Sequence, residues 1–157
     1  HGAKVVPQLA HTGPESLSPF FKRIPPVGPS VVRTQTTLQV CRELAAEEIP
    51  ALVSLYGDAA VRARLAGYDG IELHAAHSYM LLGSFLSPLR NHRTDAYAGR
   101  KLEGRMKLLL EVLADIRGPE TFDLIRDLAA DAGVPLLRMT RITSTLADVF
   151  AGTSAAQ

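Results

Sequence analysis

The 157-residue chain has one cysteine, no tryptophan and no long apolar run. Cys41 alone cannot form an internal disulfide or complete a cysteine zinc cluster, and it fits a reducing compartment, so we expect a cytoplasmic protein. No apolar stretch approaches the roughly 20 residues of a membrane-spanning helix. Seventeen basic and sixteen acidic residues leave a net charge of +1 without a block of like charges. This balance disfavours nucleic acid and membrane surfaces as partners, and it favours a small molecule.

Apolar periodicity, with glycine and proline as stop signals, divides the chain into alternating strands and helices. The length suits a single domain over residues 1–157. Five prolines and two glycines predict a long surface loop without regular structure over residues 12–32. We expect strands at 4–10, 71–74 and 134–139, and helices at 46–66, 106–116, 122–129 and from 143 or 144 to 150.

Helix, glycine, apolar strand and polar loop occur twice in succession, which is typical of βα units around a parallel sheet. In such folds the chemistry lies on the loops that follow the carboxyl ends of the strands. The strand at 71–74 ends in His74, and His77 and Tyr79 follow within five residues. The pattern therefore predicts a hydrogen-bonding site for a substrate in this loop, and the stretch 140–143 occupies the equivalent place after the later strand.

The run DGIELHAAHSYMLLGSFLSPLRNHRTDAYAG, residues 69–99, resembles the signature of the old yellow enzyme family of FMN-dependent ene-reductases. Upstream, KVVPQLAHTG resembles the third barrel strand of that family, and CRELAAEEI resembles the start of the next helix. Downstream, LEGRMKLLLEVLADIR continues the likeness, and GVPLLRMTRIT resembles the seventh strand and its phosphate-binding loop. The resemblance implies an α/β fold, a partial TIM-type (β/α)8 barrel with parallel strands.

Compared with a complete barrel of that family, the chain resembles a truncated, internally deleted copy. Residues 1–118 resemble the region from strand three to the helix after strand four. Residues 119–157 resemble the region from the helix before strand seven to the helix after it. Pairing with another chain in a homo-oligomer is one arrangement that would close such an incomplete barrel.

The resemblance implies an FMN-dependent NAD(P)H oxidoreductase that reduces the activated C=C bonds of enones or related alkenes. His74 and His77 would donate hydrogen bonds to the activating oxygen of the alkene, and Tyr79 would give a proton to the α-carbon. Gln8, His74 and Arg141 would contact the cofactor, Gln8 at the pyrimidine edge and Arg141 at the phosphate. Asn91, Arg93, Thr94 and Asp95 are expected to form a self-bonded loop that braces the site and takes no part in catalysis.

Each of these residues also has a structural interpretation. The two histidines of the loop would bond only to backbone, Tyr79 would be a core aromatic residue, Gln8 a structural amide, and Arg141 a solvated side chain. A metal site is disfavoured because no partner carboxylate follows the His-x-x-His pair at the usual spacing. The alternative function is that of a non-catalytic barrel remnant without bound flavin.

Overall fold

The computed structural model describes residues 2–34 and 38–116. The chain divides into two compact units, His1–Phe122 and Asp123–Gln157, so every described residue belongs to the first unit. The elements expected at 122–129, 134–139 and 143–150 lie outside the described residues. The single domain expected over residues 1–157 stays a prediction.

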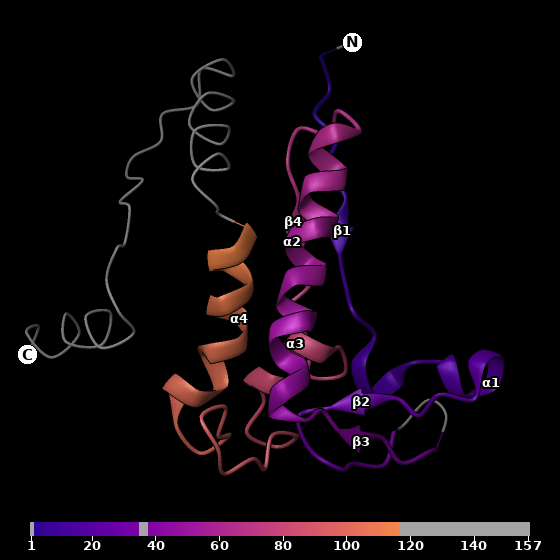
Figure 1. The fold of residues 1–157 in the computed structure, drawn as a ribbon, viewed down its shortest axis with the longest axis vertical. Helices are drawn as coiled ribbons and strands as arrows, with labels where there is room; N and C mark the ends of the chain where they lie inside the picture. The colour runs from indigo at the N-terminus through magenta and orange to yellow at the C-terminus, as the bar shows by residue number, and fades with distance from the viewer. Residues whose placement is uncertain (1, 35–37, 117–157) are drawn as a thin grey trace, which may run out of the picture. The chain divides into compact units, whose positions relative to one another are not determined.

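Two short strands, β1 (Gln8–Leu9) and β4 (Glu72–Leu73), pair in parallel and run side by side (Figure 1). The backbone N–H of His74 continues the ladder and donates to the carbonyl of Leu9 at 2.9 Å. Both strands lie inside the ranges expected from the sequence, and both are shorter than expected. The parallel orientation predicted from the βα pattern is confirmed.

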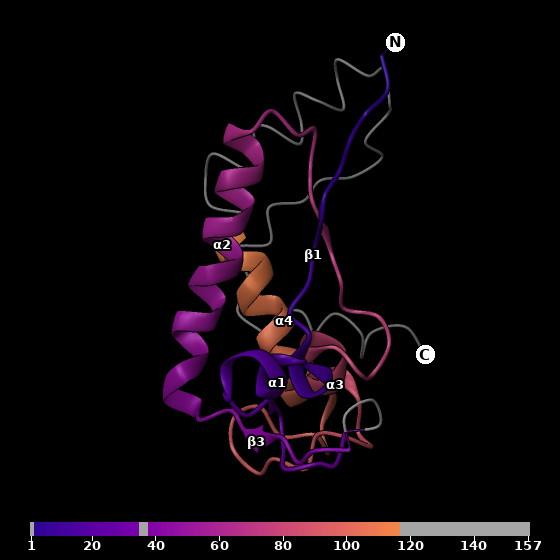
Figure 2. The ribbon, with the colours of Figure 1, turned by 90° about the vertical axis from the view of Figure 1, so that its right-hand side faces the viewer.

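A layer of two helices covers one side of these strands. The helices are α2 (Ile49–Leu65) and α4 (Leu102–Ile116), which pack against each other (Figure 2). Their core residues recur at helical spacing, and each such burial stabilises the fold by about 1.5–3 kcal/mol. The buried members are Ile49, Leu52, Tyr56, Leu108, Val112 and Ile116.

The predicted helix at 46–66 is confirmed. Its first turn is a 3-10 turn at Ala46–Glu48, and the chain leaves the helix at Gly67, whose φ of +82° suits a residue without a Cβ. Helix α4 begins at Leu102, four residues before the predicted start at Met106; its first turn holds the exposed Leu102 and the buried Gly104, so no apolar stripe marks it in the sequence.

The expectation of no regular element over residues 12–32 is wrong in part. The segment holds a 3-10 turn at Gly13–Glu15, the short helix α1 (Ser18–Lys22) and the strand β2 (Val27–Gly28). Proline is tolerated in the first turn of a helix, where its missing N–H costs nothing, so Pro14 and Pro19 begin elements instead of preventing them.

Strand β2 pairs in parallel with β3 (Arg42–Glu43), and this pairing joins two parts of the long segment between β1 and α2. Cys41, just before β3, is buried and free, and its thiol donates to the carbonyl of Ser30 at 3.2 Å. A further helix that the sequence did not predict, α3 (Leu81–Leu86), follows the loop after β4 and is buried over most of its length.

The loop between α3 and α4 is held by buried polar side chains. The Asn91 amide donates to the carbonyls of Phe85 and Tyr97, both at 2.9 Å. Arg93 donates to the Leu44 carbonyl at 2.6 Å and pairs with Asp95. This confirms the expected self-bonded loop.

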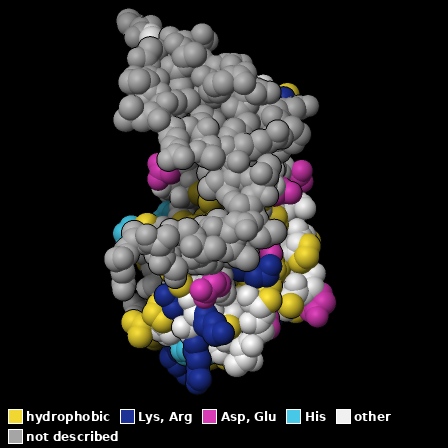
Figure 3. Space-filling model, turned by 90° about the vertical axis from the view of Figure 1, so that its left-hand side faces the viewer, with side chains coloured by type: hydrophobic (Ala, Val, Ile, Leu, Met, Phe, Trp, Pro, Cys, Tyr) yellow, Lys and Arg dark blue, Asp and Glu magenta, His cyan; other side chains and the backbone are white. Residues whose placement is uncertain are grey.

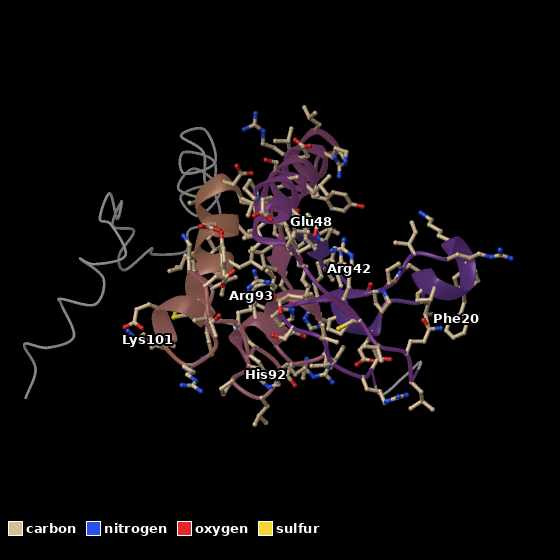
Figure 4. All side chains as sticks on the ribbon, turned by 60° about the horizontal axis from the view of Figure 1, so that its bottom comes forward. Phe20, Arg42, Glu48, His92, Arg93 and Lys101 are labelled. Atoms are coloured by element: carbon tan, nitrogen blue, oxygen red, sulfur yellow. The ribbon has the colours of Figure 1, made fainter. Side chains whose placement is uncertain are left out.

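The same loop also reaches the segment that precedes α2, because the guanidinium of Arg93 binds there. Figure 4 shows Arg93 in the interior and its neighbour His92 at the periphery. The ion pair of Arg42 with Glu48, both labelled in Figure 4, adds a second, exposed connection between β3 and the start of α2.

On the coloured part of the face shown in Figure 3, both acidic and basic side chains reach the surface. Within residues 2–34 and 38–116, no helix is long and apolar enough to cross a membrane.

We expect Asn91→Ala to lower the free energy of unfolding by about 2–4 kcal/mol, because it leaves two buried carbonyls without their donor. Urea denaturation followed by circular dichroism measures the change. Thr94→Ala, an exposed position in the same loop, is the control and should stay within about 0.5 kcal/mol of the parent. Equal stability of the two variants would contradict the bracing role.

Hydrogen bonds from Arg93, with its positive charge, hold the pKa of Asp95 below its ordinary value. A carboxylate whose pKa is depressed by folding contributes stability above its unfolded pKa of about 3.9, and this stability is lost as pH falls through the folded value. We therefore expect the free energy of unfolding to fall below about pH 4, and to fall less steeply in Asp95→Asn. Urea titrations at several pH values test this, with the exposed Asp58→Asn as control; an unchanged slope in Asp95→Asn would refute it.

Candidate functional site

The carboxyl ends of β1 and β4 lie at the same edge of the sheet, because the two strands are parallel. Loop 74–80 leaves β4 at this edge and carries His74, His77 and Tyr79. At the end of β1, the carbonyl of His11 accepts a hydrogen bond from the N–H of Leu81 at 3.0 Å. The backbone after β1 is therefore bonded to the start of α3, directly beyond the histidine loop.

The structure brings the three predicted ring residues together. The ring centroids of His74 and His77 are 5.7 Å apart, and those of His74 and Tyr79 are 6.1 Å apart. His77 stacks on Tyr79, with centroids 5.5 Å apart and ring planes inclined by only 22°. Two imidazoles and one phenol thus form one cluster, which we call the ring cluster.

The members of the ring cluster differ in exposure. His77 and Tyr79 are exposed, Tyr79 by 39%, whereas His74 is half-buried. The Nδ1 atom of His74 is buried, and among the described residues no group forms a hydrogen bond with it. Because buried polar atoms are normally satisfied, this nitrogen is suited to bind a polar group of a ligand.

Tyr79 also differs from the buried tyrosines of the described region. Burial raises the pKa of Tyr56 to about 12, and burial with a hydrogen bond to Glu111 raises the pKa of Tyr97 to about 12. Both belong to the core. Tyr79, in contrast, is exposed on loop 74–80, so the structural interpretation of Tyr79 as a core aromatic residue is wrong.

Gln8 lies on β1 opposite Glu72 of β4, and its Nε2 donates to Oε1 of Glu72 at 2.5 Å. A carboxylate only accepts hydrogen bonds, so the NH₂ side of the amide faces Glu72 and the carbonyl oxygen of Gln8 is left for a donor. His74 follows β4 directly and continues its ladder, two residues after Glu72, which places the two residues on the same face. The alternate residues Leu9 and Leu73 pack against the hydrophobic core instead.

Helix α3 supports the loop that carries the ring cluster. Gly83 lies directly against the carbonyls of Ala76 and His77, and a Cβ at this position would collide with the His77 oxygen. His77 itself adopts a φ of +61°, in the left-handed region that residues with a Cβ rarely occupy. The loop therefore depends on contacts with α3 that the His-x-x-His pattern did not reveal. In the sequence, these contacts are indicated only by two small residues, Gly83 and Ser84, within an apolar run.

A hollow of about 490 Å³ lies beside α1, and no ring-cluster residue lines it. Its walls come from the segment after β1, namely Thr12, Glu15, Ser16, Leu17, Ser18, Phe21 and Lys22. Among the described residues there is no group of three or more His, Cys, Asp or Glu suited to hold a metal ion.

The sequence of residues 1–123 matches the NADH:flavin oxidoreductase / NADH oxidase family. The chain belongs to this family. Its members are FMN-dependent NAD(P)H oxidoreductases, so the resemblance to old yellow enzymes is confirmed. The match ends at residue 123, and Arg141 therefore lies outside both the matched and the described residues. Its predicted phosphate contact stays a prediction.

Individual relatives agree with this assignment. The chain is 41% identical over 117 residues to an NADH oxidase of Thermoanaerobacter brockii. The aligned region covers 74% of this chain and 18% of that protein. It is 39% identical over 118 residues to an NADPH dehydrogenase of Bacillus subtilis, covering 74% of this chain and 32% of that protein. The chain thus spans about a third or less of the length of these two relatives.

Solved structures support the fold. The chain resembles morphinone reductase in complex with tetrahydroNAD, with a TM-score of 0.69 and 32% identity, over 76% of this chain and 38% of that one. It also resembles the old yellow enzyme homologue of Zymomonas mobilis, with a TM-score of 0.67 and 35% identity, over 73% and 34% of the two chains. The predicted fold class, part of a TIM-type α/β barrel with parallel strands, is confirmed.

We expect Gly83→Ala to lower the free energy of unfolding by about 1–3 kcal/mol, because the added methyl group meets the His77 carbonyl. Gly70→Ala is the matched control, since a Cβ there would make only an ordinary contact with Val6. Urea denaturation compares the two. A Gly83→Ala variant as stable as Gly70→Ala would show that α3 does not hold the loop closely.

Proposed function

We propose that this chain carries the reactive part of an FMN-dependent NAD(P)H oxidoreductase that reduces the activated C=C bonds of enones or related alkenes. The observation that carries the proposal is the convergence of His74, His77 and Tyr79 at the carboxyl end of β4. Family membership supplies the reaction class, and the ring cluster supplies donors for the polar end of a small substrate.

The described residues fit a flavin. The carbonyl oxygen of Gln8 would accept a hydrogen bond from an N–H at the pyrimidine edge of the ring, since the amide nitrogen of Gln8 already donates to Glu72. The unpartnered Nδ1 of His74 offers a second polar contact, and Arg141 would neutralise the phosphate. FMN, when bound, would supply the hydride that the alkene accepts at its β-carbon, after reduction by NAD(P)H.

His74 and His77 would act on the substrate oxygen. A neutral imidazole offers one N–H donor, so two imidazoles with centroids 5.7 Å apart can both donate to one oxygen that lies between them. Negative charge develops on that oxygen as the alkene is reduced, and donors fixed in advance stabilise it without reorganisation. The pair would therefore lower the barrier and also orient the alkene.

Tyr79 would donate the proton that completes the reduction at the α-carbon. Its phenol lies in the ring cluster, stacked on His77, so a substrate oxygen held by the histidines would keep its adjoining carbons close to the hydroxyl. The phenol is a weak acid, which suits protonation of the strongly basic carbon that forms when the β-carbon is reduced.

We also propose a cytoplasmic location and association with another copy of the chain. The free, buried Cys41 is compatible with a reducing compartment. Large apolar side chains are exposed on the outer sides of α1 and α2, which favours association. They include Phe20, Phe21, Leu55 and Leu65, and Figure 4 shows Phe20 at the outer side of α1.

A flavin titration tests the first part of the proposal. We expect the purified chain to bind FMN, with quenching of the flavin fluorescence, and to oxidise NADPH faster when cyclohexenone is present. A chain that binds no FMN would support the non-catalytic remnant instead.

Substitution of the ring cluster tests the assigned roles. His74→Ala and His77→Ala should each lower kcat/KM for cyclohexenone by about 10²–10³-fold, and Tyr79→Phe by about 10²-fold. The control is His92→Ala, an exposed histidine at the periphery, whose rate should match the parent. Equal rates in the parent and both loop-histidine variants would remove the imidazoles from the mechanism.

A further inference from the structure

Ser84 makes a hydrogen bond that connects α3 to the ring cluster. Its side chain is fully buried, and its hydroxyl donates to the carbonyl of Ser78 at 2.7 Å. Ser78 stands between His77 and Tyr79 in the chain. Among the buried residues of α3, Ser84 alone carries a polar side chain, and its hydroxyl is directed at the loop.

The neighbouring residue of α3 makes this contact part of a larger support. Gly83 lies against the carbonyls of Ala76 and His77, and Ser84 bonds the carbonyl of Ser78. Three successive carbonyls of the loop therefore face two successive residues of one helix.

The loop needs such support because of the backbone at His77. A φ of +61° is disfavoured for a residue with a Cβ, so the isolated loop would relax toward negative φ. A change of this torsion reorients the His77 side chain relative to Tyr79 and would separate the stacked rings. The hydroxyl of Ser84 holds the carbonyl of the next residue and so opposes the relaxation.

We propose that Ser84 is a positioning residue, which keeps the His77 ring stacked on Tyr79 and thereby aligns the hydrogen-bond donor with the proton donor. The proposal deepens the function proposed above and rests on it for the roles of the two rings. Ser84 itself touches neither substrate nor cofactor in this scheme; it acts through the backbone of the loop.

Nuclear magnetic resonance of the histidine rings tests the proposal in the full chain without flavin. The stacking effect is the difference in His77 ring-proton chemical shift between the parent and Tyr79→Leu, which lacks the stacked ring. We expect the His77 shift in Ser84→Ala to move at least halfway from the parent value to the Tyr79→Leu value. Ser84→Cys nearly conserves the volume but donates weakly, so its His77 shift should move by a similar amount. Ser30→Ala is the control, because it removes another buried serine hydroxyl bonded to backbone, far along the chain from the loop, and it should keep the full difference.

The outcomes separate the two proposals. Retention of the His77 shift in both Ser84 variants, or an equal loss in Ser30→Ala, would overturn the positioning role. In the flavin-loaded chain, Ser84→Ala should lower kcat about tenfold with little change in KM, since alignment and not binding is lost. A chain that binds no FMN but shows the expected shifts would refute the proposed function and leave the positioning of the rings intact.

Discussion

The parallel pairing of β1 with β4 is the constraint on which the described structure depends. It joins residues more than sixty positions apart in the chain, since Gln8 lies opposite Glu72. The alternation of side chains along each strand then sends Leu9 and Leu73 to the helix layer and leaves Gln8, Glu72 and His74 on the other face. One ladder thus separates the core from the polar face, and it also delivers the histidine loop to a defined edge.

Beyond the strands, buried polar contacts hold segments that have little regular structure. The amide of Asn91 bonds the carbonyl of Phe85 in α3 and that of Tyr97 in its own loop. The guanidinium of Arg93 bonds the carbonyl of Leu44, in the segment before α2. The contacts of α3 with loop 74–80 serve the same purpose next to the site. Irregular backbone must find partners for its polar groups, and here side chains provide them. The ring cluster therefore rests on a loop whose backbone contacts Gly83 and Ser84 of α3.

Family membership and the ring cluster support different parts of the functional argument. The match over residues 1–123 shows that the chain belongs to the NADH:flavin oxidoreductase / NADH oxidase family. The geometry at His74, His77 and Tyr79 concerns this chain itself, and it is what the proposed reduction of activated alkenes requires: donors for an oxygen, and a proton source beside them. In the proposed reaction the flavin would bring the redox chemistry, and the protein would supply orientation and charge stabilisation.

Sequence by itself determined the features that are local: the helix at 46–66 from its periodicity, the family and the ring residues from the motif at 69–99, and the bracing loop around Asn91. It missed α3, because six residues make too short a helix for a periodic pattern. It also missed the helical elements that begin near Pro14 and Pro19, because the sequence does not distinguish a proline in the first turn of a helix from a proline in a loop. Only the tertiary structure decided that the three rings converge and that Ser84 holds their loop, because both depend on a left-handed residue and on a helix packed behind it. Contacts of this kind are formed through space and leave no period in the chain.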